Sequence, residues 1–230
     1  PHLGVTVYED FYKSEYQKAL YSADDALEFR TKLLNIFASN SATTWIEAKQ
    51  IEERFKKVQI ENITSKPPTM VGVDLSVRDD FSTVTYNLYS VDSRSFHSYT
   101  DYYFPDGALE KHPNCELYKG WVKAGYLKLC KGDIIDYQQI VDDILKMANY
   151  LCIMGIGYDP YKSAEFVNLL SSSVGGEADI INPVKQTYGT FTSPVESFEI
   201  AIYSNKISFD PNPITPYCFA NAVLDEDRNC

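Results

Sequence analysis

The chain has 230 residues, 44% of them hydrophobic, and carries a formal net charge of −11. This length fits one large domain or one domain with an appendage, and no apolar run approaches the ~20 residues that cross a bilayer. The acidic charge argues against a protein that binds nucleic acid with its whole surface. The 5 cysteines are odd in number and include no C-x-x-C pair, which favours reduced thiols in a cytoplasm over a disulfide scaffold or a cysteine zinc site.

Residues 1–64 are predicted to form a helical segment, because apolar residues recur there at helical spacing. The run WIEAKQIEERFKK is typical of an amphipathic helix with Ile46 and Ile51 turned inward. Pro67 and Pro68 follow shortly afterwards and do not continue a helix. We therefore place a domain boundary between residues 64 and 65.

Beyond this boundary the pattern changes to strands and then to alternating helices and strands. Strands are predicted over residues 70–76, 82–90, 95–104, 152–160 and 178–184. Helices are predicted over residues 115–124, 137–150, 163–170 and 194–203, while residues 212–223 fit either a helix or an extended segment. This order predicts an α/β fold with a mixed sheet flanked by helices, preceded by the N-terminal helical segment.

Two aspartates each end a short apolar strand, Asp74 after MVGV and Asp159 after CIMGIGY. Ligands gather at the carboxyl ends of strands in open α/β sheets, so neighbouring parallel strands would bring these carboxylates together. Two close carboxylates repel unless a cation lies between them, and their oxygens suit Mg²⁺ or Mn²⁺. Two such ions ~3.5–4 Å apart are a recurring device for cutting phosphodiesters. The alternative for each aspartate is a turn former or a helix cap.

These aspartates stand in a series of motifs that resembles the nuclease domain of a tailed-bacteriophage terminase large subunit. GVDLSVRDDFSTV resembles the opening strand of that family with its first metal-binding Asp. WVKAGYLKLCKGDIIDYQQIVDDI resembles its Trp…Gly-x-x-x-Asp-Tyr run, and IGYDPYKSAEFVNLL resembles the strand that bears the second metal-binding Asp. The resemblance covers about residues 65–225.

The resemblance implies a ribonuclease H-like (retroviral integrase) fold and a metal-dependent endonuclease. Such a domain cuts concatemeric double-stranded DNA with two Mg²⁺ or Mn²⁺ ions while viral DNA is packaged in the host bacterial cytoplasm. Asp74 and Asp159 correspond to the catalytic metal ligands, and Asp80 to a neighbour of the metal site. The portal and the small terminase subunit would be partners through the full-length protein, and no membrane is involved.

The resemblance also divides the chain into residues 1–64, the helical tail and linker of an absent ATPase domain, and residues 65–230, the nuclease domain. No G-x-x-x-x-G-K-[ST] motif occurs, so we expect no ATP site in this chain. The first residue is Pro1 rather than Met, which suggests a fragment or a processed product. The family usually supplies a third acid, which we expect beyond Cys230 at a truncated C-terminus. Asp225, Glu226 and Asp227 are substitutes that no motif supports.

Candidate DNA contacts are few, and DNA affinity comes mostly from cations near phosphates. Lys185 follows a strand, Lys162 follows Asp159 by three residues, and Arg78 lies beside the first acids. A solvated surface cation is the alternative for each, and the net charge predicts weak DNA binding by the isolated domain.

Two other functions stay open at this point. The first is a catalytically incomplete nuclease-fold module that docks to the packaging motor or binds DNA. The second is a sugar-kinase or actin-like ATPase, although LSVRDDFST lacks the Gly-rich phosphate turn of those folds.

Overall fold

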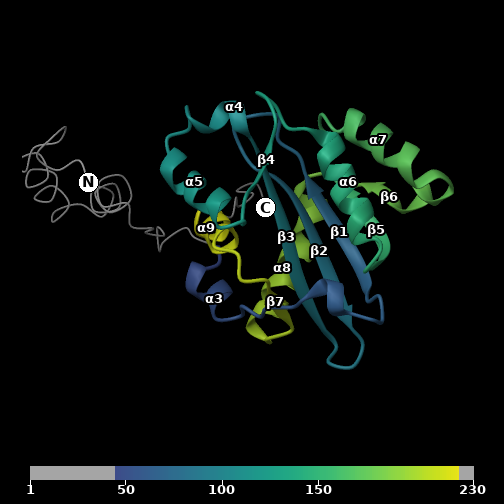
Figure 1. Ribbon diagram of the computed structural model, residues 1–230. Coiled ribbons are helices and arrows are strands. Elements are labelled where there is room, and N and C mark those ends of the chain that lie inside the picture. Colours follow the sequence, from purple (N-terminus) through teal and green to yellow (C-terminus); the bar gives the residue numbers. More distant parts are fainter. Residues whose placement is uncertain (1–44, 223–230) are drawn as a thin grey trace, which may run out of the picture. The chain divides into compact units, whose positions relative to one another are not determined.

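The computed structural model describes residues 45–222 (Figure 1). These residues fall into two compact units, and one of them comprises Ile51–Thr215. Residues 45–50 and 216–222 belong to the other. The larger unit contains the sheet, Asp74, Asp159 and the other predicted DNA and metal contacts. The helical prediction for residues 1–44 and the acids at 225–227 lie outside the described part of the chain.

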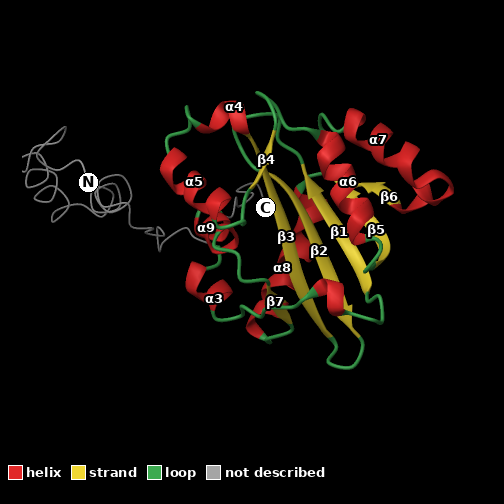
Figure 2. Cartoon of the chain, viewed as in Figure 1, coloured by secondary structure: helices red, strands yellow, loops and turns green. Residues whose placement is uncertain are grey.

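The centre of the larger unit is a mixed sheet with the strand order β4-β3-β2-β1-β5-β6, and β7 pairs with β3 beside this path (Figure 2). β2 is antiparallel to both of its neighbours, and every other pair is parallel. The carboxyl ends of β1, β3 and β5 therefore lie at the same edge. The strands are β1 (Pro68–Asp74), β2 (Ser82–Ser90), β3 (Ser95–Pro105), β4 (Lys128–Cys130), β5 (Cys152–Tyr158), β6 (Ile181–Pro183) and β7 (Ile207–Phe209).

The alternation of residue types along the central strands decides which side of each strand is buried. In β1, Val71 and Val73 are buried while Gly72 and Asp74 are exposed. Because side chains alternate with a period of two, β1 turns one apolar side to the core. Its opposite side carries Gly72 and Asp74 at the carboxyl end of the strand.

Helices cover both faces of the sheet (Figure 2). On one face, Ile140 and Ile144 of α6 and Phe166 and Leu170 of α7 pack with the inward strand residues in one hydrophobic core. The Asp136 carboxylate begins α6 by accepting N–H groups from the first turn. The described helices are α3 (Ala48–Glu52), α4 (Asp106–Leu109), α5 (Cys115–Lys123), α6 (Tyr137–Met147), α7 (Ala164–Val174), α8 (Tyr188–Tyr203), α9 (Ile214–Ala220) and the 3₁₀ helices η2 (Ile60–Asn62) and η3 (Gly175–Ile180).

An aromatic cluster holds α5 against the sheet. Phe81, in the loop between β1 and β2, contacts Tyr118 with ring centroids 5.0 Å apart and Trp121 at 6.3 Å. Phe104 of β3 meets Phe81 at 6.0 Å and Tyr118 at 5.3 Å, both edge to face. Such pairs add ~0.5–1.5 kcal/mol to the area that they bury. The loop after β1 is thus anchored at its C-terminal end by Phe81.

The predicted mixed sheet with flanking helices is confirmed, and the predicted strands and helices are found with shifted ends. The helix expected over WIEAKQIEERFKK is shorter and ends at Glu52, although Ile46 and Ile51 are buried as predicted. The helix expected from Pro194 begins instead at Tyr188, because the Thr187 hydroxyl accepts the N–H of Thr190 at 3.3 Å and caps it. Residues 212–223, which fitted either a helix or an extended segment, contain the helix α9.

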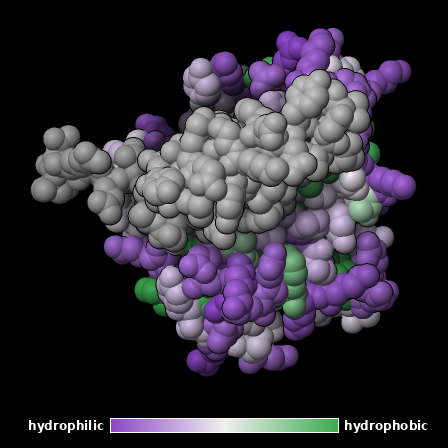
Figure 3. Space-filling view, turned by 90° about the vertical axis from the view of Figure 1, so that its left-hand side faces the viewer, coloured by the Kyte–Doolittle hydropathy of each residue, from purple (hydrophilic) through white to green (hydrophobic). Residues whose placement is uncertain are grey.

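The strands β4 and β7 were not predicted, since three residues are too few for a detectable pattern. In the part of the chain that the structure describes, no helix has the length and apolarity needed to span a membrane. Hydrophilic residues dominate the described surface on the face drawn in Figure 3, and hydrophobic ones appear there as separate spots.

Candidate active site

The parallel pairing of β1 with β5 brings Asp74 and Asp159 to one edge of the sheet. Val73 pairs with Tyr158 at the end of this ladder, and each aspartate is the next residue along its strand. The negative charge of Asp159 raises the pKa of Asp74, so the two carboxylates lie within electrostatic reach of each other. The structure thus brings together the two residues that the sequence singled out.

Both aspartates line an open groove of about 360 Å³ on the sheet face opposite α6. Gly72 and Gly157 form part of its lining, and a Cβ atom on Gly72 would meet nothing within 4 Å. A Cβ atom on Gly157 would stand 3.1 Å from Val184 Cγ2. The absence of side chains at these two positions therefore leaves the groove open beside the carboxylates. The lining residues are Gly72, Val73, Asp74, Thr83, Thr85, Gly157, Tyr158, Asp159, Val184, Gln186 and Phe191.

The pKa of Asp74 is raised above its ordinary value of 3.8. Partial withdrawal from water is the largest cause, followed by the charges of Asp159 and Asp80, while the Leu75 N–H lowers it. Each of the three raising effects disfavours the ionised form. A divalent cation between the carboxylates would relieve this repulsion, and their oxygens are ligands that Mg²⁺ and Mn²⁺ accept.

We expect Asp74→Asn to raise the melting temperature of the metal-free protein at pH 7 by about 1–3 °C, the size typical of a solvent-accessible charge. A carboxyl group whose pKa is raised by folding stabilises the fold when protonated. This contribution is present below pH 3.8 and is lost as the pH rises through the higher folded value. The advantage of the variant should therefore vanish on acidification. Thermal denaturation of both proteins between pH 3.5 and 7 measures it.

The same experiment with Mn²⁺ should reverse the order, because a ligand that binds only the folded state stabilises it. Asp142→Asn is the matched control. Asp142 lies on α6, away from the groove, and its Oδ1 atom accepts a hydrogen bond from Gln138 Nε2 at 2.8 Å. An unchanged difference between the wild type and Asp74→Asn across this pH range would contradict the electrostatic repulsion at Asp74.

Asp159 is held at the start of the loop that follows β5. Its Oδ1 atom accepts the N–H of Tyr161 at 2.9 Å, an Asx turn that fixes the carboxylate. Tyr161 is 70% exposed, and the Lys162 ammonium lies 5.1 Å from the centre of its ring. Lys162 has a φ of 54°, a conformation that is uncommon for residues other than glycine. Lys162 is thus presented to solvent beside Asp159.

Asp80 does not line the groove, although its charge raises the pKa of Asp74. Its Oδ1 atom accepts the N–H of Phe81 at 2.7 Å. Lys185 lies between two groove residues, Val184 and Gln186. Arg78 lines a different hollow and lies 3.8 Å from Asp79. The structure therefore places Lys185 and Lys162 beside the groove and Arg78 apart from it.

Several groove residues were not singled out from the sequence as site residues. Thr83 and Thr85 come from β2, whose polar side faces the groove, and their alternation with Val84 was a signal for that placement. Gln186 follows β6 beside Lys185, in a segment whose position after a strand and before a glycine turn pointed to the site, whereas no sequence pattern points to Phe191 at the start of α8. Among the side chains that the structure describes, those of residues 45–175 and 179–222, no group of three or more His, Cys, Asp or Glu is arranged to hold a metal ion. A third acidic ligand is thus not found among them.

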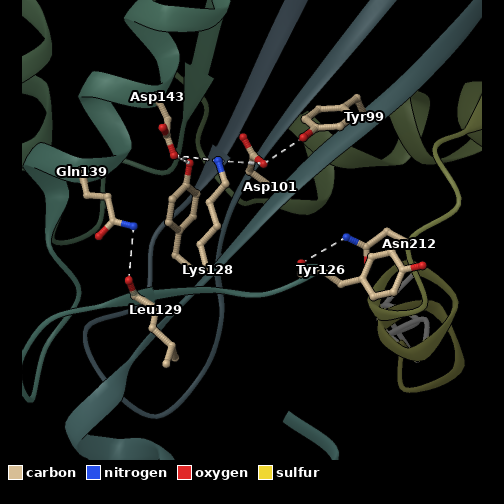
Figure 4. A network of polar contacts seen from close by, with 9 residues as sticks. Tyr99, Asp101, Tyr126, Lys128, Leu129, Gln139, Asp143 and Asn212 are labelled. Atoms are coloured by element: carbon tan, nitrogen blue, oxygen red, sulfur yellow. Dashed lines mark hydrogen bonds and ion pairs between the residues drawn. The ribbon is translucent and has the colours of Figure 1, made fainter. Parts of the chain in front are cut away.

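A second polar cluster lies on the sheet face that α6 covers (Figure 4). The Lys128 ammonium is 3.0 Å from Asp101 Oδ1 and 2.7 Å from Asp143 Oδ2. The Tyr99 hydroxyl donates to Asp101 at 3.2 Å, and the Tyr103 hydroxyl donates to Asp143 at 2.9 Å. The cluster ties β3, β4 and α6 together, and it faces away from the groove.

Asp101 and Lys128 each shift the pKa of the other. Burial raises the pKa of Asp101 even though the charge of Lys128 opposes it. For Lys128, burial works against the ammonium, but Asp101 and Asp143 outweigh that effect and leave its pKa raised. The Lys128 ammonium thus lies between the two acidic side chains and is stabilised by both of them.

Comparisons with known proteins agree with these features. The sequence model of the family described as "Terminase large subunit, endonuclease domain" matches residues 1–229. Protein YmfN of Escherichia coli (strain K12) is 28% identical over 239 residues, which cover 97% of this chain and 50% of that protein. The match of the family model confirms the family resemblance of the motifs and decides against the sugar-kinase or actin-like alternative.

Solved structures with the same fold are also phage terminases. The large terminase of bacteriophage HK97 superposes with a TM-score of 0.70 and 19% identity, covering 99% of this chain and 46% of that chain. The large terminase nuclease from thermophilic phage G20c, with bound magnesium, superposes with a TM-score of 0.50 and 6% sequence identity. The match covers 81% of this chain and 84% of that chain. The predicted ribonuclease H-like fold class is thereby confirmed. The chain spans about half the length of YmfN and of the HK97 protein.

Proposed function

The chain belongs to the family of terminase large subunit endonuclease domains, and from this premise we propose that it is a divalent-metal-dependent endonuclease acting on double-stranded DNA. The observation that supports this most is the meeting of Asp74 and Asp159 in one open groove, with the pKa of Asp74 raised. A turn former or helix cap needs no such partner. Two acids at the carboxyl ends of adjacent parallel strands suit metal-assisted hydrolysis.

Asp74 and Asp159 would hold Mg²⁺ or Mn²⁺, with two ions expected in the complete site. The magnesium bound to the G20c nuclease supports this choice. When bound, such ions activate water as a nucleophile and stabilise the leaving oxygen. The two carboxylates leave coordination positions for water and phosphate oxygens. Asp80, through its effect on Asp74, would adjust the affinity of the site rather than coordinate from within the groove.

The remaining roles follow from the position of each side chain. Thr83, Thr85 and Gln186 line the groove and offer hydrogen bonds to the DNA backbone. Lys162, which follows β5, and Lys185, which follows β6, would contact phosphates. Gly72 and Gly157 keep the space that the DNA backbone needs to approach the carboxylates.

In the longer protein, this domain would cut concatemeric DNA during packaging in the host cytoplasm, beside an ATPase domain, the portal and the small terminase subunit. The net charge of −11 favours such an arrangement, because a weakly binding nuclease depends on the motor to hold its substrate. Because the nuclease would then bind DNA tightly only when the motor holds it, this arrangement would also limit cleavage of other DNA. In this arrangement, residues 1–64 would be the tail of the ATPase domain and its linker, and residues 65–230 would be the nuclease domain.

A second candidate function is a catalytically incomplete module that docks to the motor or binds DNA. It is favoured by one observation, namely that no three-acid cluster occurs among the described side chains of residues 45–175 and 179–222. The two candidates differ in a single respect, since only the first hydrolyses DNA.

The experiment that tests the proposal combines Mn²⁺ calorimetry with nicking of supercoiled plasmid. The nuclease is expected to bind Mn²⁺ and to convert the plasmid to open-circular and linear forms, and EDTA should abolish both. Metal binding without nicking would support the docking module. Absence of binding and of nicking would overturn the metal-dependent endonuclease.

We expect Lys185→Gln to weaken DNA binding without changing Mn²⁺ affinity. Removal of one cation from the DNA phosphates should lower the slope of log K against log[salt] by about 1. Lys146→Gln is the matched control, because Lys146 is exposed on α6, on the other face of the sheet. Fluorescence anisotropy with a short duplex in Ca²⁺ at several salt concentrations measures the slope. Equal salt slopes for Lys185→Gln and Lys146→Gln would show that Lys185 does not contact the DNA phosphates.

A further inference from the structure

A second hollow, of about 250 Å³, lies at the same edge of the sheet as the groove. Three of its side chains carry N–H donors: Arg78 from the loop after β1, and Lys111 and His112 from the turn between α4 and α5. The lining residues are Arg78, Asp79, Phe104, Ala108, Lys111, His112 and Pro113. None of the metal-binding roles proposed above uses this hollow.

His112 is fixed as a hydrogen-bond donor. Its Nδ1 atom accepts the N–H of Asn114 at 3.1 Å, so the neutral ring carries its proton on Nε2. The ring stacks on Tyr118 with centroids 4.3 Å apart and meets the edge of Phe104 at 5.5 Å. These contacts hold the imidazole in one plane, and its N–H group needs an acceptor from solvent or from a ligand.

Two cationic side chains line the hollow. Arg78 has a loose ion pair with Asp79 at 3.8 Å, and both side chains are largely exposed, at 46% and 91%. Lys111 has no carboxylate within ion-pair distance among the described side chains of residues 45–175 and 179–222. The cations Arg78 and Lys111 and the neutral donor His112 face the carboxylate of Asp79 in the lining, and the charge of Asp80 also reaches His112. The two cations offset these two acids, on a chain whose net charge is −11.

The second hollow lies close enough to the groove for one DNA strand to contact both. β1 and β3 are both antiparallel to β2, so Asp74 at the end of β1 and Phe104 near the end of β3 lie at one edge, two strand spacings apart. Two spacings amount to ~10 Å. Successive phosphates of one DNA strand are farther apart than the ~3.4 Å axial rise per nucleotide, because the backbone also winds around the axis, so this distance spans one or two phosphates. The loop between β1 and β2 connects the two hollows, because Asp74 and Thr83 at its ends line the groove while Arg78 and Asp79 within it line the second hollow.

We infer that Arg78, Lys111 and His112 form a phosphate subsite that binds the DNA backbone about one or two phosphates from the cleaved bond. The inference rests on the proposed nuclease function and adds to it a positioning site outside the metal groove. Arg78 and Lys111 supply charge-assisted hydrogen bonds, and His112 supplies an uncharged one. The subsite fixes the direction in which the strand enters the groove.

Binding of a short DNA duplex to the chain in Ca²⁺ tests the subsite. Lys111→Gln is expected to weaken binding about five- to tenfold at low salt and to lower the salt slope by about 1. Lys119→Gln is the matched control, because Lys119 is already paired with Glu110 at 2.9 Å and Glu116 at 3.2 Å. In NMR spectra, the duplex should shift the ring signals of His112 and leave the buried His97 unchanged.

The position of the subsite is tested with duplexes that carry one uncharged methylphosphonate linkage, moved step by step along the strand. A neutral linkage about one or two phosphates from the cut should weaken wild-type binding as much as Lys111→Gln does, with no added loss when the two are combined. Additive losses at every position, or equal binding by Lys111→Gln and Lys119→Gln, would overturn the subsite. Plasmid nicking by the wild type in that case would leave the nuclease proposal standing.

Discussion

Asp74→Asn and Asp159→Asn are each expected to reduce Mn²⁺-dependent plasmid nicking by at least ~100-fold, because a metal site contributes several kcal/mol of charge stabilisation in the transition state. Asparagine keeps the size of the side chain but removes the negative charge that holds the cation. Both changes act on the same groove. The double variant should therefore be no less active than the weaker single variant, because the two residues act as one unit.

Initial rates of nicking at saturating Mn²⁺, with calorimetric Mn²⁺ affinities for each variant, measure this effect. Asp142→Asn on α6 is the control and should keep its activity within about twofold, as expected for a surface change away from the site. Full activity of Asp159→Asn would mean that Asp159 only forms its Asx turn with Tyr161. The nuclease centre would then have to be sought elsewhere.

Lys128→Met is expected to destabilise the larger unit by about 2–3 kcal/mol and to lower its melting temperature by about 5–10 °C. The change leaves Asp101 and Asp143 without the cation that lies 3.0 Å and 2.7 Å from them. Removing one partner of a buried pair costs ~3–5 kcal/mol, and we expect less here because the Lys128 side chain is 36% exposed. Methionine keeps most of the apolar contact that the lysine stem makes.

The loss of stability in Lys128→Met should depend on pH. The pKa of Asp101 is already raised by burial and should rise further without the cation. A carboxyl group with a raised folded pKa stabilises the fold below its ordinary pKa of 3.8 and loses that contribution as the pH rises through the folded value. The variant should therefore lie closest to the wild type in acid and furthest from it at neutral pH.

Urea denaturation of both proteins between pH 4 and 8 provides the measurement. Asp101→Asn combined with Lys128→Met serves as the control, because the amide removes one uncompensated charge and should restore part of the stability. A loss that stays the same at every pH would show that Lys128 acts through packing alone. The nicking activity should be retained at temperatures where the variant is folded, since the cluster faces away from the groove.

The sequence by itself determined the type and order of most elements, because their signals are local. The alternation in MVGVD and STVTYNLYS predicts strands buried on one side, and the apolar stripe of residues 137–147 predicts α6. The two candidate metal ligands were also evident, since an acid that directly follows a short apolar strand is visible in the chain alone. The family resemblance was carried by the same motifs.

Only the tertiary structure decided which strands are neighbours. The β1–β5 pairing joins residues more than eighty positions apart in the chain, and no local pattern encodes that choice. From this pairing follow the approach of Asp74 to Asp159, the glycine-lined groove and the contribution of Gln186 and Phe191 to it. The Asp101–Lys128–Asp143 cluster was missed for the same reason, because its members come from β3, β4 and α6. Long-range pairing is fixed by the burial of the whole core, so these contacts exist only once the chain has folded.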